Sequence, residues 1–279
     1  MTARDGGWAA VPGRFPAPVW LGALTFALVG VLACRTRQDH AAERTTVEVP
    51  APRAPLRLPD SLFPPPTRPV SSIVSPRWSN EDERDDAGEA RTVLDLAGVT
   101  TGTAVADIGA GDGYYTLRAA RLVGAGGRVW AEDIRADYLD LLRARLAAAP
   151  APNVVLALGE PGDPRLPANA VDVALMIHMY HEITQPFALL ANLAPSLRPG
   201  ARLVVVDQER PTNAHGTPTA LLRCEVTAMG YRWRERRSLT DGAYTAVFDA
   251  PVSPDSLTPP SRLPAVLAAR RCDTATGPE

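Results

Sequence analysis

Residues 105–116 read VADIGAGDGYYT and combine acids with glycines in a pattern that can hold a ligand. Gly109, Gly111 and Gly113 permit a tight turn and let the backbone approach a ligand closely, because glycine has no Cβ atom. A helix that begins at Tyr114 would point its free N–H groups at that ligand. The segment therefore predicts a nucleotide cofactor bound where a strand turns into a helix.

The acids of this segment indicate which cofactor is favoured. A dinucleotide fingerprint has glycines at its first, third and sixth positions, whereas the sixth position counted from Gly109 is Tyr114. Asp107 and Asp112 would also repel a pyrophosphate in a partly desolvated site. A sulfonium compound with a free α-amino group reverses the sign of that interaction. The pattern therefore favours S-adenosylmethionine over a dinucleotide.

A second pair of acids follows on the next predicted strand. The segment GRVWAEDI at 127–134 ends in Glu132 and Asp133, and Asp133 lies twenty positions after Gly113. This is the spacing of a carboxylate that accepts hydrogen bonds from ribose hydroxyls, and we prefer Asp133 over Glu132 for that role. The alternative is that either acid caps a helix beginning near Ala136.

Together these motifs resemble those of the class I S-adenosylmethionine-dependent methyltransferases, in the group of predicted methyltransferases. The resemblance runs from about Ser75 to Pro251. Besides VADIGAGDGYYT it rests on AEDI, DPRLP, VDVALMIHMYHEI, LRPGARLVVVDQERPTNAHGTP and AVFDAP. It implies methyl transfer from S-adenosylmethionine to a small-molecule acceptor.

The resemblance also implies roles for individual residues. The glycine turn would line the methionine and ribose end of the cofactor, and the loop 159–162 would lie beside adenine, although Pro161 lacks the N–H that could bond the ring. Glu160 stands where the family often has an aspartate. The expected cofactor-binding residues are Asp107, Gly109, Gly111, Asp112, Gly113, Tyr115, Asp133 and Glu160.

Apolar strands and amphipathic helices alternate through this region. They predict an α/β fold: a Rossmann-like three-layer sandwich with a mostly parallel seven-stranded sheet and an antiparallel C-terminal hairpin. Ligands of such sheets bind beyond the carboxyl ends of the strands. Strands are expected near 103–108, 127–132, 153–158, 171–177, 202–207, 231–238 and 243–249, and helices at 81–97, 114–122, 136–148, 186–196 and 218–228.

Three histidines follow strands that should end at this ligand-binding edge. His178 and His181 come after the fourth strand, and His215 after the fifth. An imidazole can remove a proton from a hydroxyl acceptor near neutral pH. We expect His181 and His215 to be catalytic, with Tyr115, Tyr180 and Asp207 lining the acceptor pocket.

Other interpretations of the same histidines stay open. His178 can end a strand and pack, while His181 and Glu182 can be cap and surface residues. His178, His181, Glu182 and His215 could also hold a metal ion, but they show no recognised metal spacing. We therefore expect no metal.

Composition excludes several classes of function. The chain has 279 residues and a formal net charge of −2, which gives no general attraction to nucleic acid. It contains no lysine, which removes lysine-dependent phosphate loops and Schiff-base chemistry. The three cysteines, Cys34, Cys224 and Cys272, are widely spaced, and we do not expect a disulfide framework.

The ends of the chain differ in composition from the methyltransferase region. The apolar segment ending at Cys34 resembles a bacterial signal peptide or membrane anchor, and VLAC resembles a lipoprotein processing box in which Cys34 is lipidated. We expect a membrane-associated protein, on a side that the sequence does not fix. The predicted domains are 1–34 signal peptide or anchor, 35–74 proline-rich disordered linker, 75–251 methyltransferase domain and 252–279 proline-rich tail.

Three functions remain open from sequence alone. The leading hypothesis is a methyltransferase acting on an unidentified small-molecule acceptor. The second is a membrane-tethered cofactor-binding protein without turnover, since export would separate the chain from S-adenosylmethionine made in the cytosol. The third is a nicotinamide-dependent oxidoreductase, which the missing third glycine of the fingerprint disfavours.

Overall fold

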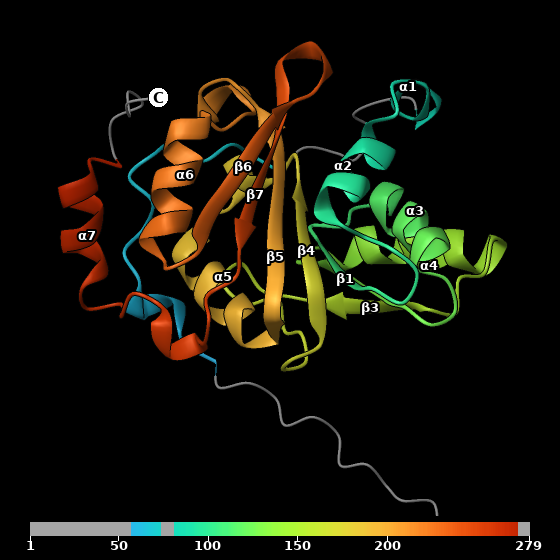
Figure 1. Ribbon diagram of the computed structural model, residues 1–279, viewed down its shortest axis with the longest axis horizontal. Coiled ribbons are helices and arrows are strands. Elements are labelled where there is room, and N and C mark those ends of the chain that lie inside the picture. Colours follow the sequence, from blue (N-terminus) through green and yellow to red (C-terminus); the bar gives the residue numbers. More distant parts are fainter. Residues whose placement is uncertain (1–56, 74–80, 273–279) are drawn as a thin grey trace, which may run out of the picture. The chain divides into compact units, whose positions relative to one another are not determined.

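The computed structural model describes residues 57–73 and 81–272, and within them seven strands form one sheet (Figure 1). The strand order is β3-β2-β1-β4-β5-β7-β6. Strands β1 to β5 pair in parallel, and β7 is antiparallel to β5 and to β6. The predicted fold class is confirmed. The strands are β1 (Ala104–Ile108), β2 (Arg128–Asp133), β3 (Val154–Leu158), β4 (Val171–Ile177), β5 (Leu197–Gln208), β6 (Arg232–Ser238) and β7 (Ala243–Asp249).

Helices cover both faces of the sheet, as the alternating side chains of the strands require. On β5, Leu203 and Val205 belong to a core cluster with residues of α5 and α6, whereas Val204 and Val206 belong to a second cluster with residues of α2 and α3. The result is the predicted three-layer sandwich. The helices are α1 (Glu81–Asp86), α2 (Glu89–Ala97), α3 (Tyr114–Val123), α4 (Ala136–Ala148), α5 (Pro186–Leu193), α6 (Thr219–Ala228) and α7 (Leu263–Arg270).

Two predicted helices are shorter than expected. The helix predicted at 81–97 is divided into α1 and α2 at Gly88, whose φ of 67° is left-handed and interrupts the helical hydrogen bonds. The helix predicted at 186–196 ends as α5 at Leu193 and continues as a single 3₁₀ turn, Ala194–Ser196. Pro195 lies in that turn and has no N–H to extend the α-helix.

The N-terminal strap, residues 57–73, packs on the methyltransferase region, although the sequence predicts a disordered linker there. The side-chain amide of Asn192 accepts a hydrogen bond from the Leu58 N–H at 2.8 Å and donates one to the Leu58 carbonyl at 2.9 Å. Phe63 is buried in the core that contains α5 and α6. Single anchoring side chains hold the strap, and they leave no periodic pattern in the sequence.

A buried ion pair fixes the other end of the strap. The Arg68 guanidinium donates to both oxygens of Glu225 on α6 at 3.2 Å and to the Tyr180 carbonyl at 3.0 Å. The Tyr180 hydroxyl donates to the same Glu225 carboxylate at 3.0 Å. Both charged side chains are almost completely buried. The strap is therefore bound to the segment that directly precedes His181.

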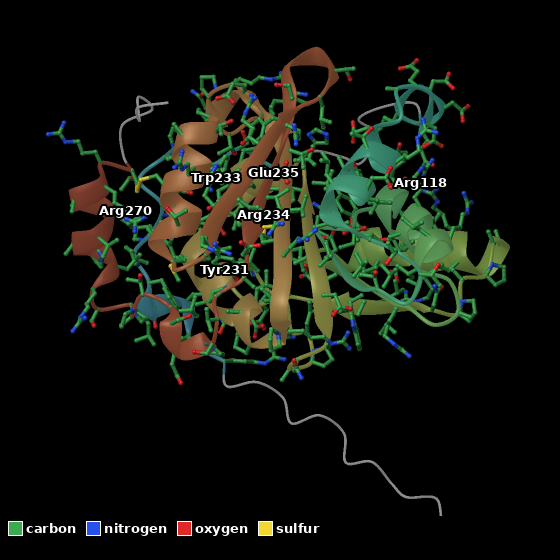
Figure 2. All side chains as sticks on the ribbon, viewed as in Figure 1. Arg118, Tyr231, Trp233, Arg234, Glu235 and Arg270 are labelled. Atoms are coloured by element: carbon green, nitrogen blue, oxygen red, sulfur yellow. A yellow bond between two sulfur atoms is a disulfide. The ribbon has the colours of Figure 1, made fainter. Side chains whose placement is uncertain are left out.

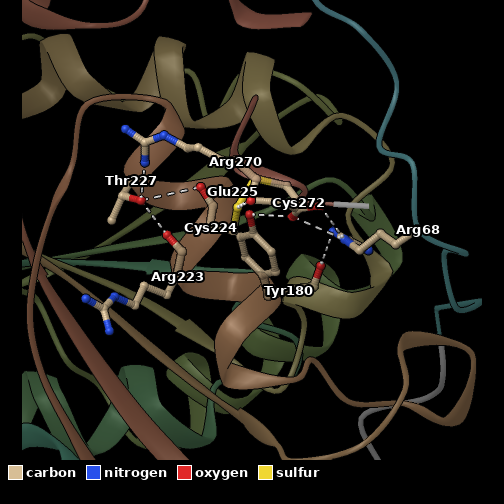
Figure 3. The surroundings of a disulfide bond; sticks show 8 residues. All are labelled: Arg68, Tyr180, Arg223, Cys224, Glu225, Thr227, Arg270 and Cys272. Carbon is tan, nitrogen blue, oxygen red and sulfur yellow. Dashed lines mark hydrogen bonds and ion pairs between the residues drawn. A yellow bond between two sulfur atoms is a disulfide. The ribbon is translucent and has the colours of Figure 1, made fainter. Parts of the chain in front are cut away.

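A disulfide joins α6 to the end of α7 (Figure 3). Cys224 and Cys272 are 48 residues apart, with their Cα atoms separated by 5.5 Å. The sequence does not predict this bond, because so long a separation leaves no local motif. Within the predicted tail 252–279, α7 is folded, and Leu263 at its start is fully buried.

Strand β6 forms one edge of the sheet and shows the alternation of a half-buried strand. Trp233 packs edge-on against Phe248 of β7, with ring centroids 5.2 Å apart. Its neighbour Arg234 is more exposed and forms an ion pair with Asp249 at 3.0 Å (Figure 2). Charged side chains along an edge strand oppose pairing with other chains.

Several predictions concern residues outside the described ranges. They are the signal peptide or anchor at 1–34, the lipidation of Cys34, and the parts of the linker and domain at 35–56 and 74–80. In the part of the chain that the structure describes, no helix is both long and apolar enough to cross a membrane.

Candidate active site

A cavity of about 650 Å³ opens at the carboxyl ends of the parallel strands. Its wall includes the turn after β1, the end of β2, the loops after β3 and β4, and residues 71–73 of the strap. This is the expected ligand-binding edge of a parallel α/β sheet. The cavity has two ends with different chemistry: a cofactor end beside the glycine turn and an acceptor end beside His181.

The glycine turn has the geometry that its sequence predicts. Gly109, Gly111 and Gly113 have φ values of 71°, 57° and 93°, which L side chains rarely adopt. A Cβ atom at Gly113 would lie 2.3 Å from a methyl carbon of Leu142, and one at Gly109 would lie 3.1 Å from Met179. Helix α3 begins at Tyr114 directly after the turn. The glycines therefore let a ligand approach the backbone closely, while the N–H groups of Gly111 and Gly113 are bonded to Asp133 and to the Ala110 carbonyl.

Three carboxyl groups converge at the cofactor end. Asp107 is buried and accepts a hydrogen bond from the Thr116 hydroxyl at 2.6 Å. Burial raises the pKa of Asp107 to about 6, the Thr116 hydrogen bond opposes this, and the nearby charge of Asp133 adds to it. Burial also raises the pKa of Glu132 well above its usual range, with a further contribution from Asp133.

Asp133 is already held by backbone groups. Its two carboxylate oxygens accept hydrogen bonds from the N–H of Gly111 at 2.9 Å and of Arg135 at 2.8 Å. Each oxygen keeps a second lone pair, so the carboxylate can still accept bonds from ribose hydroxyls. Glu132 also lines the cavity, and one of its oxygens has no hydrogen-bond partner among the described residues. The ribose role of Asp133 stays a prediction.

The other predicted cofactor residues all line the cavity. Asp112 forms an ion pair with Arg145 at 3.3 Å, and Glu160 forms one with Arg165. Tyr115 is buried, and its hydroxyl donates to Glu89. The predicted cofactor residues therefore line the cavity, except Gly113, which lies behind the wall against Leu142.

The sequence did not predict the polar group formed by Glu89, Arg84 and His178 on the cavity wall next to Tyr115. Glu89 lies between Arg84, at 2.6 Å, and His178, at 3.6 Å, and all three side chains line the cavity. Burial opposes ionisation of Glu89, but His178 and Arg84 outweigh it and lower its pKa to about 2. In the sequence, Glu89 follows a run of acids that indicates the start of a helix. The pattern therefore does not distinguish Glu89 from acids that only stabilise that start.

At the acceptor end, His181 is held by a buried carboxylate. Its Nδ1 atom lies 3.0 and 3.1 Å from the two oxygens of Asp207, which also accept hydrogen bonds from the Thr217 hydroxyl at 2.7 Å and the Gln208 N–H at 2.8 Å. His181 lines the cavity and is 2% exposed. Its Nε2 atom has no hydrogen-bond partner in residues 57–73 and 81–272.

His215 completes the acceptor end. Its ring is perpendicular to that of His181, at an interplanar angle of 87° and a centroid distance of 5.6 Å. Both predicted catalytic histidines therefore lie together on the cavity wall. Asp207 does not line the cavity but orients His181. Tyr180 also does not line it, since its hydroxyl is turned to Glu225, so the prediction that these two side chains face the pocket is wrong.

The cavity fits the cofactor expected from the sequence. Side chains at Gly109 and Gly113 would crowd the turn. Among the described residues, one oxygen of the buried Glu132 carboxyl group has no hydrogen-bond partner. A diphosphate placed there would meet three carboxyl groups, whereas a sulfonium or an amino group would meet complementary charge. These observations favour a cationic nucleoside over a dinucleotide.

Comparisons with known proteins agree with this geometry. Residues 105–200 match the family model described as a methyltransferase domain. The ubiquinone/menaquinone biosynthesis C-methyltransferase UbiE of Azotobacter vinelandii is 34% identical over 125 residues, which cover 44% of this chain and 49% of the relative. The protein of the same name from Pseudomonas savastanoi is 32% identical over 124 residues, 44% of this chain and 48% of its own. The chain thus spans about half the length of the curated relatives it matches.

Solved structures support the fold alone. A SAM-dependent methyltransferase from Aquifex aeolicus superimposes with a TM-score of 0.56 at 19% identity, covering 62% of this chain and 99% of that one. The cyclase SpnF superimposes with a TM-score of 0.54 at 14% identity, covering 70% and 90%. With the glycine turn and the carboxyl-lined cavity, the family match identifies residues 105–200 as a methyltransferase domain with S-adenosylmethionine as the implied cofactor, and the solved structures share its fold.

Proposed function

We propose that this chain transfers the methyl group of S-adenosylmethionine to a small-molecule acceptor bound beside His181 and His215. One observation carries the proposal. A single cavity connects the glycine turn and its carboxyl groups with two imidazoles on the opposite part of the wall. The bound cofactor supplies an electrophilic methyl group on a sulfonium sulfur.

At the cofactor end, the residues of the chain bind and orient. Asp107 and Asp133 place carboxylates where a sulfonium compound has positive charge, and the glycines of the turn let it approach the backbone closely. Asp133 would hold the ribose hydroxyls, and Glu160 would lie beside adenine. Orientation is the main contribution that a protein makes to an in-line displacement at carbon.

At the acceptor end, we assign His181 and His215 to the acceptor. An acceptor with a hydroxyl group reacts faster as its anion, so the side chains around it must promote loss of a proton. An imidazole held by a carboxylate can do this by accepting the proton, or by holding a cation that makes the hydroxyl more acidic. Ser71, Ser72 and Ile73 of the strap form part of the same wall and reduce the access of water.

A hydroxylated aromatic compound is the acceptor class that we favour. The relatives from Azotobacter and Pseudomonas are named as C-methyltransferases of ubiquinone and menaquinone biosynthesis. In its reduced form a quinone ring carries ionisable hydroxyls, and an ionised oxygen raises the nucleophilicity of the ring carbons. The cavity wall also exposes more apolar than polar surface, which suits an aromatic ring.

The proposal is tested by cofactor binding to the full chain, measured by isothermal titration calorimetry. We expect Asp107→Asn and Asp133→Asn each to weaken S-adenosylmethionine binding by roughly 100-fold or more, from the loss of charge-assisted contacts. Asp140→Asn is the matched control, since Asp140 is an exposed residue of α4 that does not line the cavity. Unchanged binding in both cavity variants would refute the proposal.

No comparison supports either alternative function, although a compartment outside the cytosol would separate the chain from S-adenosylmethionine. Tighter binding of NAD than of S-adenosylmethionine would support an oxidoreductase, but the three carboxyl groups at the turn oppose it. A binding protein without turnover would hold S-adenosylmethionine and never release S-adenosylhomocysteine in the presence of hydroxylated aromatics. Product formation followed by mass spectrometry separates this alternative from an enzyme.

We further propose that the protein matures in an oxidising compartment and is attached to a bacterial membrane through its N-terminus or a lipidated Cys34. The Cys224–Cys272 disulfide supports the first part, because such bonds persist mainly outside the reducing cytosol. A mass spectrum of the native protein tests both parts. A reduced pair would contradict the first part, and recovery of an unmodified chain outside the membrane fraction would contradict the second.

A further inference from the structure

The acceptor end contains a group of possible metal ligands, although their spacing in the sequence matches no recognised metal motif. His181, Glu182 and His215 each offer one ligand atom, and these atoms lie within 4.8 Å of one another. The Nε2 atom of His181 is 3.9 Å from a carboxylate oxygen of Glu182. Two ligands on opposite sides of an ion are at most about 4.2 Å apart when each bond is about 2.1 Å. A pair 4.8 Å apart must therefore approach by at least about 0.6 Å, and by roughly 1.4 Å in a tetrahedral arrangement, where ligands lie about 3.4 Å apart.

The tautomer of His181 is fixed in the form that a metal ligand needs. Nδ1 faces both oxygens of Asp207, so it carries the proton, and the lone pair is on Nε2. Nε2 is buried on the cavity wall and has no hydrogen-bond partner within the described residues. A carboxylate that holds the far nitrogen of an imidazole is the usual outer partner of a metal-bound histidine.

His215 is positioned by the same carboxylate through a packed turn. Thr217, two residues later, donates its hydroxyl to Asp207 and its N–H to the Gln208 carbonyl at 3.0 Å. A Cβ atom at Gly216 would lie 2.6 Å from that carbonyl, so the turn lies directly against the end of β5. His215 itself has a left-handed φ of 55°. These contacts therefore fix the backbone conformation of the turn that carries His215.

We propose that His181, Glu182 and His215 bind a divalent transition-metal ion at the acceptor end of the cavity. Two imidazoles and one carboxylate suit Zn²⁺, Fe²⁺ or Co²⁺, whereas Mg²⁺ and Ca²⁺ prefer oxygen ligands alone. Three protein ligands leave coordination positions open on the side of the cavity. His178 lies on the same wall but outside this group and interacts with Glu89 instead.

The role of the ion rests on the proposed function, although its binding does not. A hydroxyl of the acceptor would coordinate the ion and release its proton to water at the cavity mouth, leaving an oxyanion bound to the metal. The oxyanion, or a ring carbon conjugated with it, would then be the nucleophile. The ion would thus take the place of an imidazole base, and the acceptor class would be hydroxylated aromatics able to bind a metal through oxygen.

Cobalt binding to the metal-free, untagged full chain tests the site. We expect one Co²⁺ per chain, a visible d–d absorption band typical of nitrogen and oxygen ligands, and no effect of excess Mg²⁺. His181→Ala and His215→Ala should each weaken cobalt binding by roughly 100-fold or more, and Asp207→Asn by roughly 10- to 100-fold. His178→Ala is the matched control and should change the affinity by less than about twofold.

The outcomes separate the metal site from the proposed function. S-adenosylhomocysteine affinity, measured on every variant, reports whether the cofactor end is intact. If an alanine variant does not fold, cobalt binding to Glu182→Gln and Asp207→Asn tests the metal site instead. Absence of cobalt binding in the wild type, or unchanged binding after His181 and His215 are both replaced, would overturn the metal site while leaving the methyltransferase proposal standing. Loss of S-adenosylmethionine binding by the wild type would refute the proposed function alone.

Discussion

The two ends of the cavity are built in different ways. At the cofactor end, Asp107, the glycine turn and Thr116 come from one continuous segment, and Asp133 comes from the adjacent strand. At the acceptor end, Ser71, His181, Asp207 and His215 are distant in sequence and meet only because the strap and the loops after β4 and β5 converge. Cofactor recognition is therefore local in this chain, whereas acceptor recognition depends on long-range packing.

The largest effect should come from the ion pair that supports the acceptor end. Glu225→Ala would leave the buried Arg68 guanidinium without its carboxylate, which costs about 3–5 kcal/mol of unfolding free energy. Asp140→Ala, which breaks an exposed pair with Arg143, should change it by less than about 1 kcal/mol. Denaturant unfolding measures both. Equal changes in unfolding free energy for the two variants would show that the buried Arg68–Glu225 pair contributes no more to stability than an exposed pair.

A pH titration examines the charge at the cofactor end. Because burial raises the pKa of Asp107 from 3.8 to about 6, the folded state binds more protons than the unfolded state between these values. The contribution of Asp107 to stability is therefore complete below pH 4 and is lost as the pH rises through about 6. The loss is about 3 kcal/mol at about 1.4 kcal/mol per pKa unit.

Asp107→Asn removes this titration and supplies the control. The ligand-free variant should be more stable than the wild type above pH 6, yet bind S-adenosylmethionine more weakly. Affinity of the wild type should fall as Asp107 is protonated below about pH 6. Identical pH profiles of unfolding free energy for the two proteins would contradict the assignment of the charge to this carboxyl group.

Steric crowding at the glycine turn gives the next effect. Gly113→Ala would place a methyl group 2.3 Å from a carbon of Leu142, whereas Gly102→Ala meets no atom within 4 Å at a similar φ of 88°. Both variants strain the backbone by about 1–2 kcal/mol. Gly113→Ala should lose about 1–3 kcal/mol more from overpacking. Equal losses in thermal unfolding would mean that Leu142 moves aside without cost.

The smallest effect concerns the attachment of the strap. Ser71 donates its hydroxyl to the Thr212 carbonyl and its N–H to the His181 carbonyl. Ser71→Ala removes only the first bond and should cost about 0.5–1.5 kcal/mol. Affinity for S-adenosylmethionine should not change, since Ser71 lies at the other end of the cavity. A weakened cofactor affinity would show that the two ends are coupled.

The same contrast explains what the sequence could predict. The strand alternation, the glycine turn and the acids at strand ends carry local patterns, and each of them was located correctly. The strap carries no such pattern, because it is held by Asn192 and Glu225 from distant helices. His181 and His215 could be assigned to the ligand-binding edge from their place after strands, but the role of Asp207 behind them requires the side-chain direction that only packing decides.

The Cys224–Cys272 bond also bears on how the protein should be prepared. A recombinant fragment that stopped at residue 251, the predicted end of the methyltransferase domain, would lack Leu263 and Cys272. It would lose the helix that covers α6, and the orphaned thiol of Cys224 could then join two molecules together. A shortened version of this protein must therefore keep Leu263 and Cys272.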